Sequence, residues 1–211
     1  MKGKFIVFEG IDGSGEDTQL DLLYKKIKSL DKYQNILATH EPTGNATEIK
    51  RKLKHDNDAY SSGEEMALLF VEDRTQHSYE IIKPGLEKGI DVLCSRYKMS
   101  TCAFQQTQGI PLDKLLEIHE HRGILIPDLT FYLDVDGKIA EQRIHKRGEE
   151  IEKFEKIDFL DRVNLNYRNL YELSRLNKSL FGEVIKIDGN KSIHDVTEDI
   201  YQEFLNFYNK D

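Results

Sequence analysis

Short apolar runs alternate along the chain with segments whose apolar positions recur at helical spacing. The runs are rich in β-branched and aromatic residues, a composition typical of buried strands. They cover 4–8, 36–38, 90–94, 129–133 and 184–187. After the first run, the positions with helical spacing are Leu20, Leu23, Ile27 and Leu30. Because parallel strands need crossovers of this length, the pattern predicts an α/β fold with a five-stranded, mainly parallel sheet flanked by helices.

The composition is that of an ordinary globular protein with one core. The chain has 211 residues, of which 38% are hydrophobic and 32% are charged. This length fits a single domain over 1–211, and no repeat or linker divides it. The longest early apolar run, Phe5 to Phe8, is far too short for a signal-peptide core or a membrane span. We therefore expect a cytoplasmic protein with no membrane partner.

The charge balance argues against one class of partner. The net charge is −8, from 30 Lys and Arg against 38 Asp and Glu, and such a surface repels a polyanion. We therefore expect no nucleic-acid partner, although a local cluster of cations can still bind a small phosphorylated ligand. The cysteines, Cys94 and Cys102, lack the spacing of a zinc site or a disulfide framework, so we expect buried free thiols.

A glycine-rich turn follows the first predicted strand and precedes the first predicted helix. Gly10 and Gly15 are separated by four residues, which is the spacing of a phosphate-binding P-loop. That motif continues with a lysine that reaches the phosphates and a hydroxyl residue that holds Mg²⁺. This chain has Glu16 and Asp17 at these positions. Both acids also suit the first turn of a helix, because they compensate its dipole.

The orientation of Glu16 decides what this substitution costs. Unit charges about 4 Å apart interact by roughly 4 kcal/mol at an effective dielectric constant of about 20, so an inward-pointing Glu16 weakens phosphate binding by several kcal/mol relative to lysine. An outward-pointing Glu16 loses only the attraction. In a third alternative, a carboxylate of the acidic pair occupies the anion site itself. The sequence leaves all three open.

A charged segment follows the helix after the fourth predicted strand. Nine of the fourteen residues from 143 to 156 are charged, and Gly148 interrupts the helical pattern. Such a segment is either a solvated helix end or, in a phosphate-handling α/β protein, a mobile lid. Both interpretations stay open.

Five ordered motifs resemble those of thymidylate kinases. The stretch 8–15, FEGIDGSG, followed by Thr18 and Gln19, resembles the opening of that family. The other stretches are 39–44 (THEPTG), 68–74 (LLFVEDR), 95–105 (SRYKMSTCAFQ) and 127–134 (PDLTFYLD). The resemblance spans almost the whole chain. It implies a P-loop kinase fold with a lid at about 143–156.

On the donor side, the resemblance implies that ATP and Mg²⁺ bind at the glycine-rich turn. The positions that match the donor site are Gly10, Asp12, Gly13, Ser14, Gly15, Thr18 and Arg143. Asp17 stands where the family has the Mg²⁺-binding hydroxyl, and we expect it to hold the metal as a carboxylate ligand. The positions that we expect to act in catalysis are Glu9, Asp17, Arg147 and Lys153.

On the acceptor side, the resemblance implies a pocket for a pyrimidine nucleotide such as dTMP. The matching positions are Phe70, Arg74, Arg96, Ser100 and Gln105. Phe70 matches the ring that stacks on the base, and Arg74 and Arg96 match contacts to the base and the acceptor phosphate. Taken alone, an aromatic residue at helical spacing is more often core, and an arginine at the end of an element is often an ordinary ion-pair residue.

The positions at which this chain departs from the family's motifs are those expected to take part in phosphoryl transfer. Besides Glu16 and Asp17, His40 replaces an arginine and Ser95 replaces an aspartate. Phosphoryl transfer depends on charge neutralisation and positioning by such groups, so their loss lowers the rate. One hypothesis is therefore a thymidylate kinase-like nucleoside monophosphate kinase, impaired in transferring phosphoryl groups from ATP to dTMP. The alternative is a non-catalytic protein that binds a pyrimidine nucleotide, and in either case the resemblance implies a homodimer.

Overall fold

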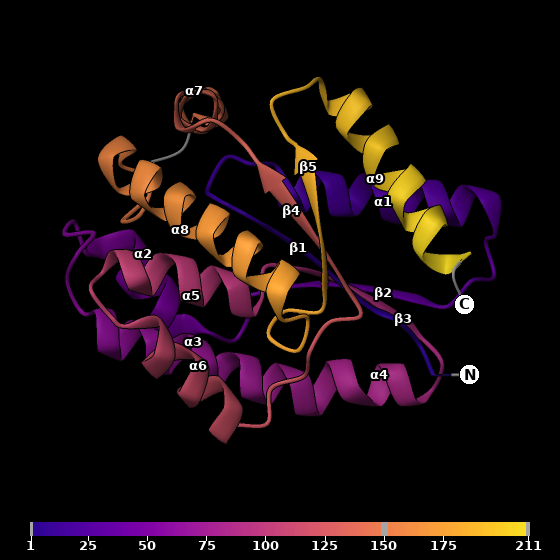
Figure 1. Cartoon of the computed structure of the whole chain (residues 1–211), viewed down its shortest axis with the longest axis horizontal. Helices are drawn as coiled ribbons and strands as arrows, with labels where there is room; N and C mark the ends of the chain where they lie inside the picture. The colour runs from indigo at the N-terminus through magenta and orange to yellow at the C-terminus, as the bar shows by residue number, and fades with distance from the viewer. Residues whose placement is uncertain (1, 149–151, 210–211) are drawn as a thin grey trace.

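A parallel sheet lies at the centre of the computed structural model, which describes residues 2–148 and 152–209 (Figure 1). Within this part of the chain the strand order is β2-β3-β1-β4-β5, and every neighbouring pair is parallel. The bounds are β1 Phe5–Gly10, β2 Ile36–His40, β3 Asp91–Ser95, β4 Leu129–Asp134 and β5 Glu183–Asp188. Each strand coincides with a predicted run within two residues at either end, so the predicted α/β fold is confirmed.

The carboxyl ends of the strands meet at one edge of the sheet, because helical crossovers make all the strands run in the same direction. At this edge Phe8 of β1 lies opposite Ser95 of β3, and His40 of β2 also lies opposite Ser95. The edge therefore brings the glycine-rich turn beside the loops that follow β2 and β3. Ligands of open parallel sheets bind at such an edge.

One face of the sheet is covered by α1 (Glu16–Leu30) and α9 (Ile193–Tyr208), which lie side by side in Figure 1. The predicted apolar positions of α1 that are buried there are Leu20, Leu23 and Ile27. Leu30 is 69% exposed, because the helix ends at this residue. The apolar stripe thus holds α1 against the sheet from just behind the glycine-rich turn.

The opposite face carries the remaining helices, of which α5 and α8 pack together against the sheet (Figure 1). Their bounds are α2 Thr47–His55, α3 Gly63–His77, α4 Lys83–Glu87, α5 Lys98–Thr107, α6 Leu112–His121, α7 Gly137–Arg147 and α8 Ile157–Leu176. A π-helical turn, Ser78–Ile82, joins α3 to α4 without a break. In the described part of the chain, no helix has the length and apolar character needed to cross a bilayer.

The charged segment at 143–156 is only in part a solvated helix end. Helix α7 stops at Gly148, whose φ of 75° is the left-handed conformation typical of a helix C-terminus. Residues 149–151, inside the expected lid, lie outside the described residues. Beyond them, Lys153 and Phe154 are only 2% and 4% exposed. The chain therefore returns to the core before α8 begins.

As expected, the thiols of Cys94 and Cys102 are free and buried.

Candidate active site

Two hollows open at the carboxyl edge of the sheet. We call the smaller one, of about 80 Å³, the acceptor pocket; its lining includes Phe70, Arg74, Ser100, Phe104, Gln105 and Phe154. We call the larger one, of about 490 Å³, the donor hollow; its lining includes Gly13, Ser14, Gly15, Glu16, Asp17, Thr18, Arg143 and Arg147. The residues that line both are Asp12, Arg96 and Glu152. The two hollows therefore share a wall that contains one arginine.

Arg74 of α3 is held at the floor of the acceptor pocket by four hydrogen bonds. Its Nε donates to Glu41 Oε2 at 2.8 Å, and its Nη1 donates to Thr101 Oγ1 at 3.0 Å and to His119 Nε2 at 2.8 Å. Its Nη2 donates to the carbonyl of Tyr97 at 2.8 Å. A guanidinium has five N–H groups, so the network leaves one N–H on Nη2 for a ligand. Arg74 is 1% exposed, and its four hydrogen bonds hold the guanidinium in one orientation.

The protonation of His119 follows from its neighbours. Its Nδ1 faces the carbonyl oxygen of Leu115 at 2.6 Å, and its Nε2 faces a guanidinium that can only donate. Nδ1 therefore carries the proton and Nε2 accepts from Arg74. Burial lowers the pKa of His119 well below its ordinary value, and the positive charge of Arg74 lowers it further. His119 is thus a neutral acceptor that orients Arg74.

Glu41 extends the same network toward the surface. Its Oε1 lies 2.9 Å from His77 Nδ1, and His77 Nε2 lies 2.8 Å from Thr39 Oγ1. Glu41 belongs to the THEPTG stretch after β2, and its carboxylate is 2% exposed. One carboxylate therefore balances the Arg74 charge and ties the loop after β2 to α3.

The apolar wall of the acceptor pocket is aromatic. Phe70 of α3 is half-buried beside the pocket, and on α5 Phe104 packs against Phe154 with 5.4 Å between the ring centroids. Gln105 is fully buried; its Nε2 donates to Gln108 Oε1 at 3.1 Å. Its Oε1 has no hydrogen-bond partner among the described residues. A buried orphan acceptor costs about 1–3 kcal/mol, so this pocket is suited to a ligand that donates a hydrogen bond.

Glu9, on β1, lies behind the acceptor pocket and contacts the residues at the start of α5. Its carboxylate accepts from Tyr97 N at 2.9 Å, Ser100 N at 3.2 Å, Ser100 Oγ at 2.5 Å and Tyr167 OH at 2.9 Å. Burial raises the pKa of Glu9, although the Ser100 and Tyr167 hydroxyls oppose the rise. These bonds fix the entry of α5 and also occupy the hydroxyl of Ser100.

The glycine-rich turn has the backbone of a phosphate cradle. Gly13 has a φ of 81°, and a Cβ added there would lie 2.5 Å from the carbonyl oxygen of Ala140 in α7. Gly15, at the N-cap of α1, has a φ of 95° and open space where a side chain would project. Arg143 lies against the turn, and its guanidinium donates to the Gly189 carbonyl at 2.8 Å. The N-terminus of α1 thus faces the donor hollow, as an anion site requires.

Glu16 points inward. The residue is 5% exposed; its Oε2 accepts from Ser14 Oγ at 2.6 Å, and its Oε1 forms an ion pair with Arg96 Nη2. The same Nη2 donates to Asp12 Oδ1 at 2.6 Å. Burial raises the pKa of Glu16, and Arg96 opposes this rise. Asp17, the next residue, is exposed at the mouth of the donor hollow.

Arg96 adopts a strained backbone conformation between the two hollows. Its φ of 62° is uncommon for a residue with a side chain, and such outliers often mark functional sites. Its Nη1 donates weakly to the Gly10 carbonyl at 3.3 Å. Burial alone would lower the pKa of Arg96, but the facing carboxylates of Glu16 and Asp12 raise it. Arg96 is therefore a permanent cation held between two acids.

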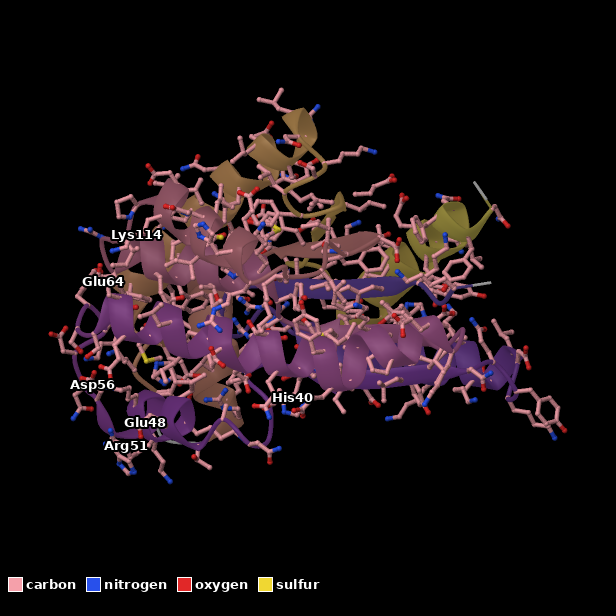
Figure 2. All side chains as sticks on the ribbon, turned by 90° about the horizontal axis from the view of Figure 1, so that it is seen from below. His40, Glu48, Arg51, Asp56, Glu64 and Lys114 are labelled. Carbon is pink, nitrogen blue, oxygen red and sulfur yellow. The ribbon has the colours of Figure 1, made fainter. Side chains whose placement is uncertain are left out.

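The expected lid cations separate into two groups. Arg143 and Arg147 line the donor hollow, where Arg147 Nη2 pairs with Glu155 Oε1 at 2.7 Å. Lys153 is instead paired with Asp56 at the end of α2, and its Nζ also donates to Ser61 Oγ at 2.9 Å. Figure 2 labels Asp56 at the edge of the molecule. Lys153 is thus not among the residues that line either hollow, although we expected it to act in catalysis.

Comparison with known proteins places the chain in a family. The family model described as thymidylate kinase matches residues 8–200. The chain belongs to the thymidylate kinase family. A probable thymidylate kinase of Pyrococcus horikoshii is 37% identical over 206 residues, which cover 95% of each chain. A thymidylate kinase of Halothermothrix orenii is 36% identical over 211 residues, which cover 95% of this chain and 96% of the relative.

Sequence reasoning missed three side chains of this thymidylate kinase-family site. Glu41 lies beside the substituted His40 in a motif that resembles the family, which was the available signal. No sequence signal pointed to His119 or Tyr167, because their partners are far away in the chain. His119 contacts Arg74 across 45 residues, and Tyr167 contacts Glu9 across 158 residues. The substituted His40 is exposed at the end of β2 (Figure 2).

Proposed function

We propose that this protein transfers the γ-phosphoryl group of ATP to a pyrimidine nucleoside monophosphate, dTMP in the first instance, at a rate reduced by Glu16. The observation that carries the proposal is the shared wall of the two hollows. Arg96 lines both, so a phosphate bound in the acceptor pocket would meet the donor phosphates beside this cation. Phosphoryl transfer requires mainly such positioning and charge neutralisation.

The base would lie between Phe70 and Phe104, within reach of the free Arg74 N–H and the orphan Gln105 Oε1. A planar ring with hydrogen-bonding edges fits this combination of aromatic faces and fixed polar groups. The pocket is narrow because Phe154 packs against Phe104.

The donor side supports the proposal only in part. The glycine backbone and Arg143 fit a phosphate, and the exposed Asp17 carboxylate fits Mg²⁺, which prefers oxygen ligands. When bound, Mg²⁺ neutralises phosphate charge. The buried Glu16 carboxylate does not fit, since it adds a negative charge beside Arg96 at the shared wall, where the donor and acceptor phosphates would meet.

The second candidate function is nucleotide binding without turnover. Glu16 favours it, because an inward carboxylate in the cradle disfavours the donor while the acceptor pocket stays assembled. In both cases we propose a homodimer in the cytoplasm, on the likeness to the family. The two candidates differ in one measurable property, the release of ADP.

A coupled ADP-release assay with dTMP and dUMP, run beside calorimetry, tests the proposal. We expect slow, dTMP-dependent ADP release and measurable dTMP binding. In a Glu16→Gln background, where no residue 16 carboxylate competes for the guanidinium, the further change Arg96→Ala should weaken dTMP binding by about 1.5–3 kcal/mol, or about 10- to 150-fold, because a charge-assisted contact is lost. Arg175→Ala, at an exposed ion pair with Glu172, is the matched control and should leave binding unchanged.

Two results would decide against this assignment. Binding of dTMP without any ADP release would establish the non-catalytic candidate instead. Absence of binding by every pyrimidine monophosphate tested, in a folded wild-type protein, would reject both candidates.

A further inference from the structure

Arg96 is the cation that an acceptor phosphate must use, given the contacts on the two sides of the shared wall. Arg74 is the other arginine of the acceptor pocket. Four of its five N–H groups donate hydrogen bonds, to Glu41, Thr101, His119 and Tyr97. Arg96 alone among the described cations lines both hollows. A phosphate between the base site and the donor turn therefore lies against Arg96.

That place is already taken by anions of the chain itself. Nη2 of Arg96 has two hydrogens, and they face two carboxylates, Asp12 Oδ1 at 2.6 Å and Glu16 Oε1. Glu16 is held there by a second bond, from Ser14 Oγ to its Oε2 at 2.6 Å. The two carboxyl groups therefore use both hydrogens of Nη2, and this nitrogen has none left for a phosphate.

We propose that Glu16 is an internal substitute for the acceptor phosphate, so that the pocket binds a pyrimidine nucleoside about as tightly as its monophosphate. This inference rests on the proposed acceptor pocket and names the class of ligand that the pocket selects. A monophosphate reaches Arg96 only after Glu16 is displaced. A nucleoside leaves the ion pair intact and gains the same contacts to its base.

Ser14 acts as the positioning residue for this substitute. Its hydroxyl binds one oxygen of Glu16 while Arg96 binds the other, so the carboxylate spans the two partners. Gly15 lies between them with a left-handed φ of 95°, and this sharp start of α1 turns residue 16 back toward the shared wall. Asp17 is exposed instead and makes no such contact.

Calorimetry with thymidine and with dTMP, without Mg²⁺ and ATP, tests this inference on the whole chain. In the wild-type protein, we expect the two dissociation constants to agree within about tenfold. In Glu16→Gln, dTMP should bind at least tenfold more tightly while thymidine changes less than twofold. Ser14→Ala should shift the ratio in the same direction by a smaller factor, and it serves as the second variant if Glu16→Gln does not fold.

Asp21→Asn is the matched control, because it removes one carboxylate from the same helix at an exposed pair with Lys25. We expect it to leave the ratio of the two constants unchanged. A ratio that is the same in wild type, Glu16→Gln and Ser14→Ala, with binding intact, overturns this inference alone. A wild-type preference for dTMP above about tenfold overturns it as well. Failure of both ligands to bind any variant overturns the acceptor pocket and, with it, the proposed function.

Discussion

Arg74 and Arg96 both line the acceptor pocket, but they differ in how their positive charge is balanced. The Arg74 network pairs one cation with one carboxylate, Glu41, and closes the remaining bonds on neutral partners; both charged side chains are 1–2% exposed. The Arg96 cluster sets one cation against two carboxylates, with side-chain exposures of 19% for Arg96, 23% for Asp12 and 7% for Glu16. The first network is balanced and sealed, whereas the second is unbalanced and open to both hollows.

The difference separates a scaffold from a switchable site. Breaking a sealed pair leaves a buried charge without compensation, so such a pair persists as structure. An unbalanced cluster at a strained backbone position can exchange one of its own anions for an anion of the ligand, and shifted pKa values and strain commonly gather at such sites.

Removal of the Arg74 cation should have the largest effect on stability. Arg74→Met leaves the buried Glu41 without its arginine and with only the His77 contact, so we expect the free energy of unfolding to fall by about 3–5 kcal/mol. Urea denaturation followed by circular dichroism measures the loss. Arg175→Met, at an exposed pair, should cost less than about 1 kcal/mol. Equal losses in the two variants would show that the sealed network is no scaffold.

Repair of the donor turn should have the next largest effect. Glu16→Lys with Asp17→Thr replaces an inward carboxylate by a cation, so we expect ATP to bind about 2–4 kcal/mol more tightly, a factor of about 30 to 1,000. The gain should be larger with Mg²⁺ present. Calorimetric titration with ATP measures it.

Turnover should recover only in part in this double variant, because Ser95 and His40 remain substituted. Adding Ser95→Asp and His40→Arg should raise the rate more than additively, since these positions meet at one sheet edge and act on one transition state. An ATP dissociation constant that the loop repair leaves unchanged, in a folded variant, contradicts our explanation of Glu16. Unimpaired wild-type turnover would show that Asp17 and the lid cations already substitute for the missing groups.

The orphan acceptor of Gln105 should matter for the ligand more than for the fold. Gln105→Leu removes a buried, unpartnered Oε1 but also the hydrogen bond from Nε2 to Gln108; these effects oppose each other, so stability should change by less than about 1 kcal/mol while dTMP affinity falls by about 1–2 kcal/mol. Gln106→Leu, whose amide donates to the Cys102 carbonyl away from the pocket lining, is the control for affinity. A Gln105→Leu protein with wild-type dTMP affinity would remove this residue from the site.

The smallest effect is a change in the pH dependence of stability. Burial raises the pKa of Glu16 above 4.5, so at pH values just above 4.5 the folded protein keeps a proton that the unfolded chain has lost. Stability from this group therefore falls as the pH rises through that window, by at most about 1.4 kcal/mol per pH unit. Urea denaturation between pH 4.5 and 7.5 should show a smaller fall in Glu16→Gln than in wild type.

Glu48 provides the opposite control for this measurement. Its exposed carboxylate pairs with Arg51 on α2, as labelled in Figure 2, and the hydrogen bond from Arg51 lowers its pKa. Its effect on stability is therefore confined to pH values at or below about 4.5. Glu48→Gln should run parallel to the wild type between pH 4.5 and 7.5. A Glu16→Gln curve parallel to both would contradict the assigned shift.

Local pattern was enough to predict the strands and the turn. Each strand is a short β-branched run, and Gly13 and Gly15 occupy positions where a left-handed φ is observed, so local sequence preferences suffice. Contacts across the chain were not predictable in this way. Lys153 meets Asp56 across 97 residues and Tyr167 meets Glu9 across 158, and no periodicity in a single sequence encodes such a pairing.

The family, the parallel α/β fold and the two acids at positions where the family's loop has a lysine and a hydroxyl residue can all be read from the amino-acid sequence alone. The tertiary structure decided where those acids point. Glu16 turns inward because Arg96, 80 positions along the chain, and Ser14 offer it two partners in one place, whereas Asp17 remains exposed. A side-chain direction is set by the charges and donors packed around it, and these are brought together only when β1, β3 and α1 share one edge of the sheet.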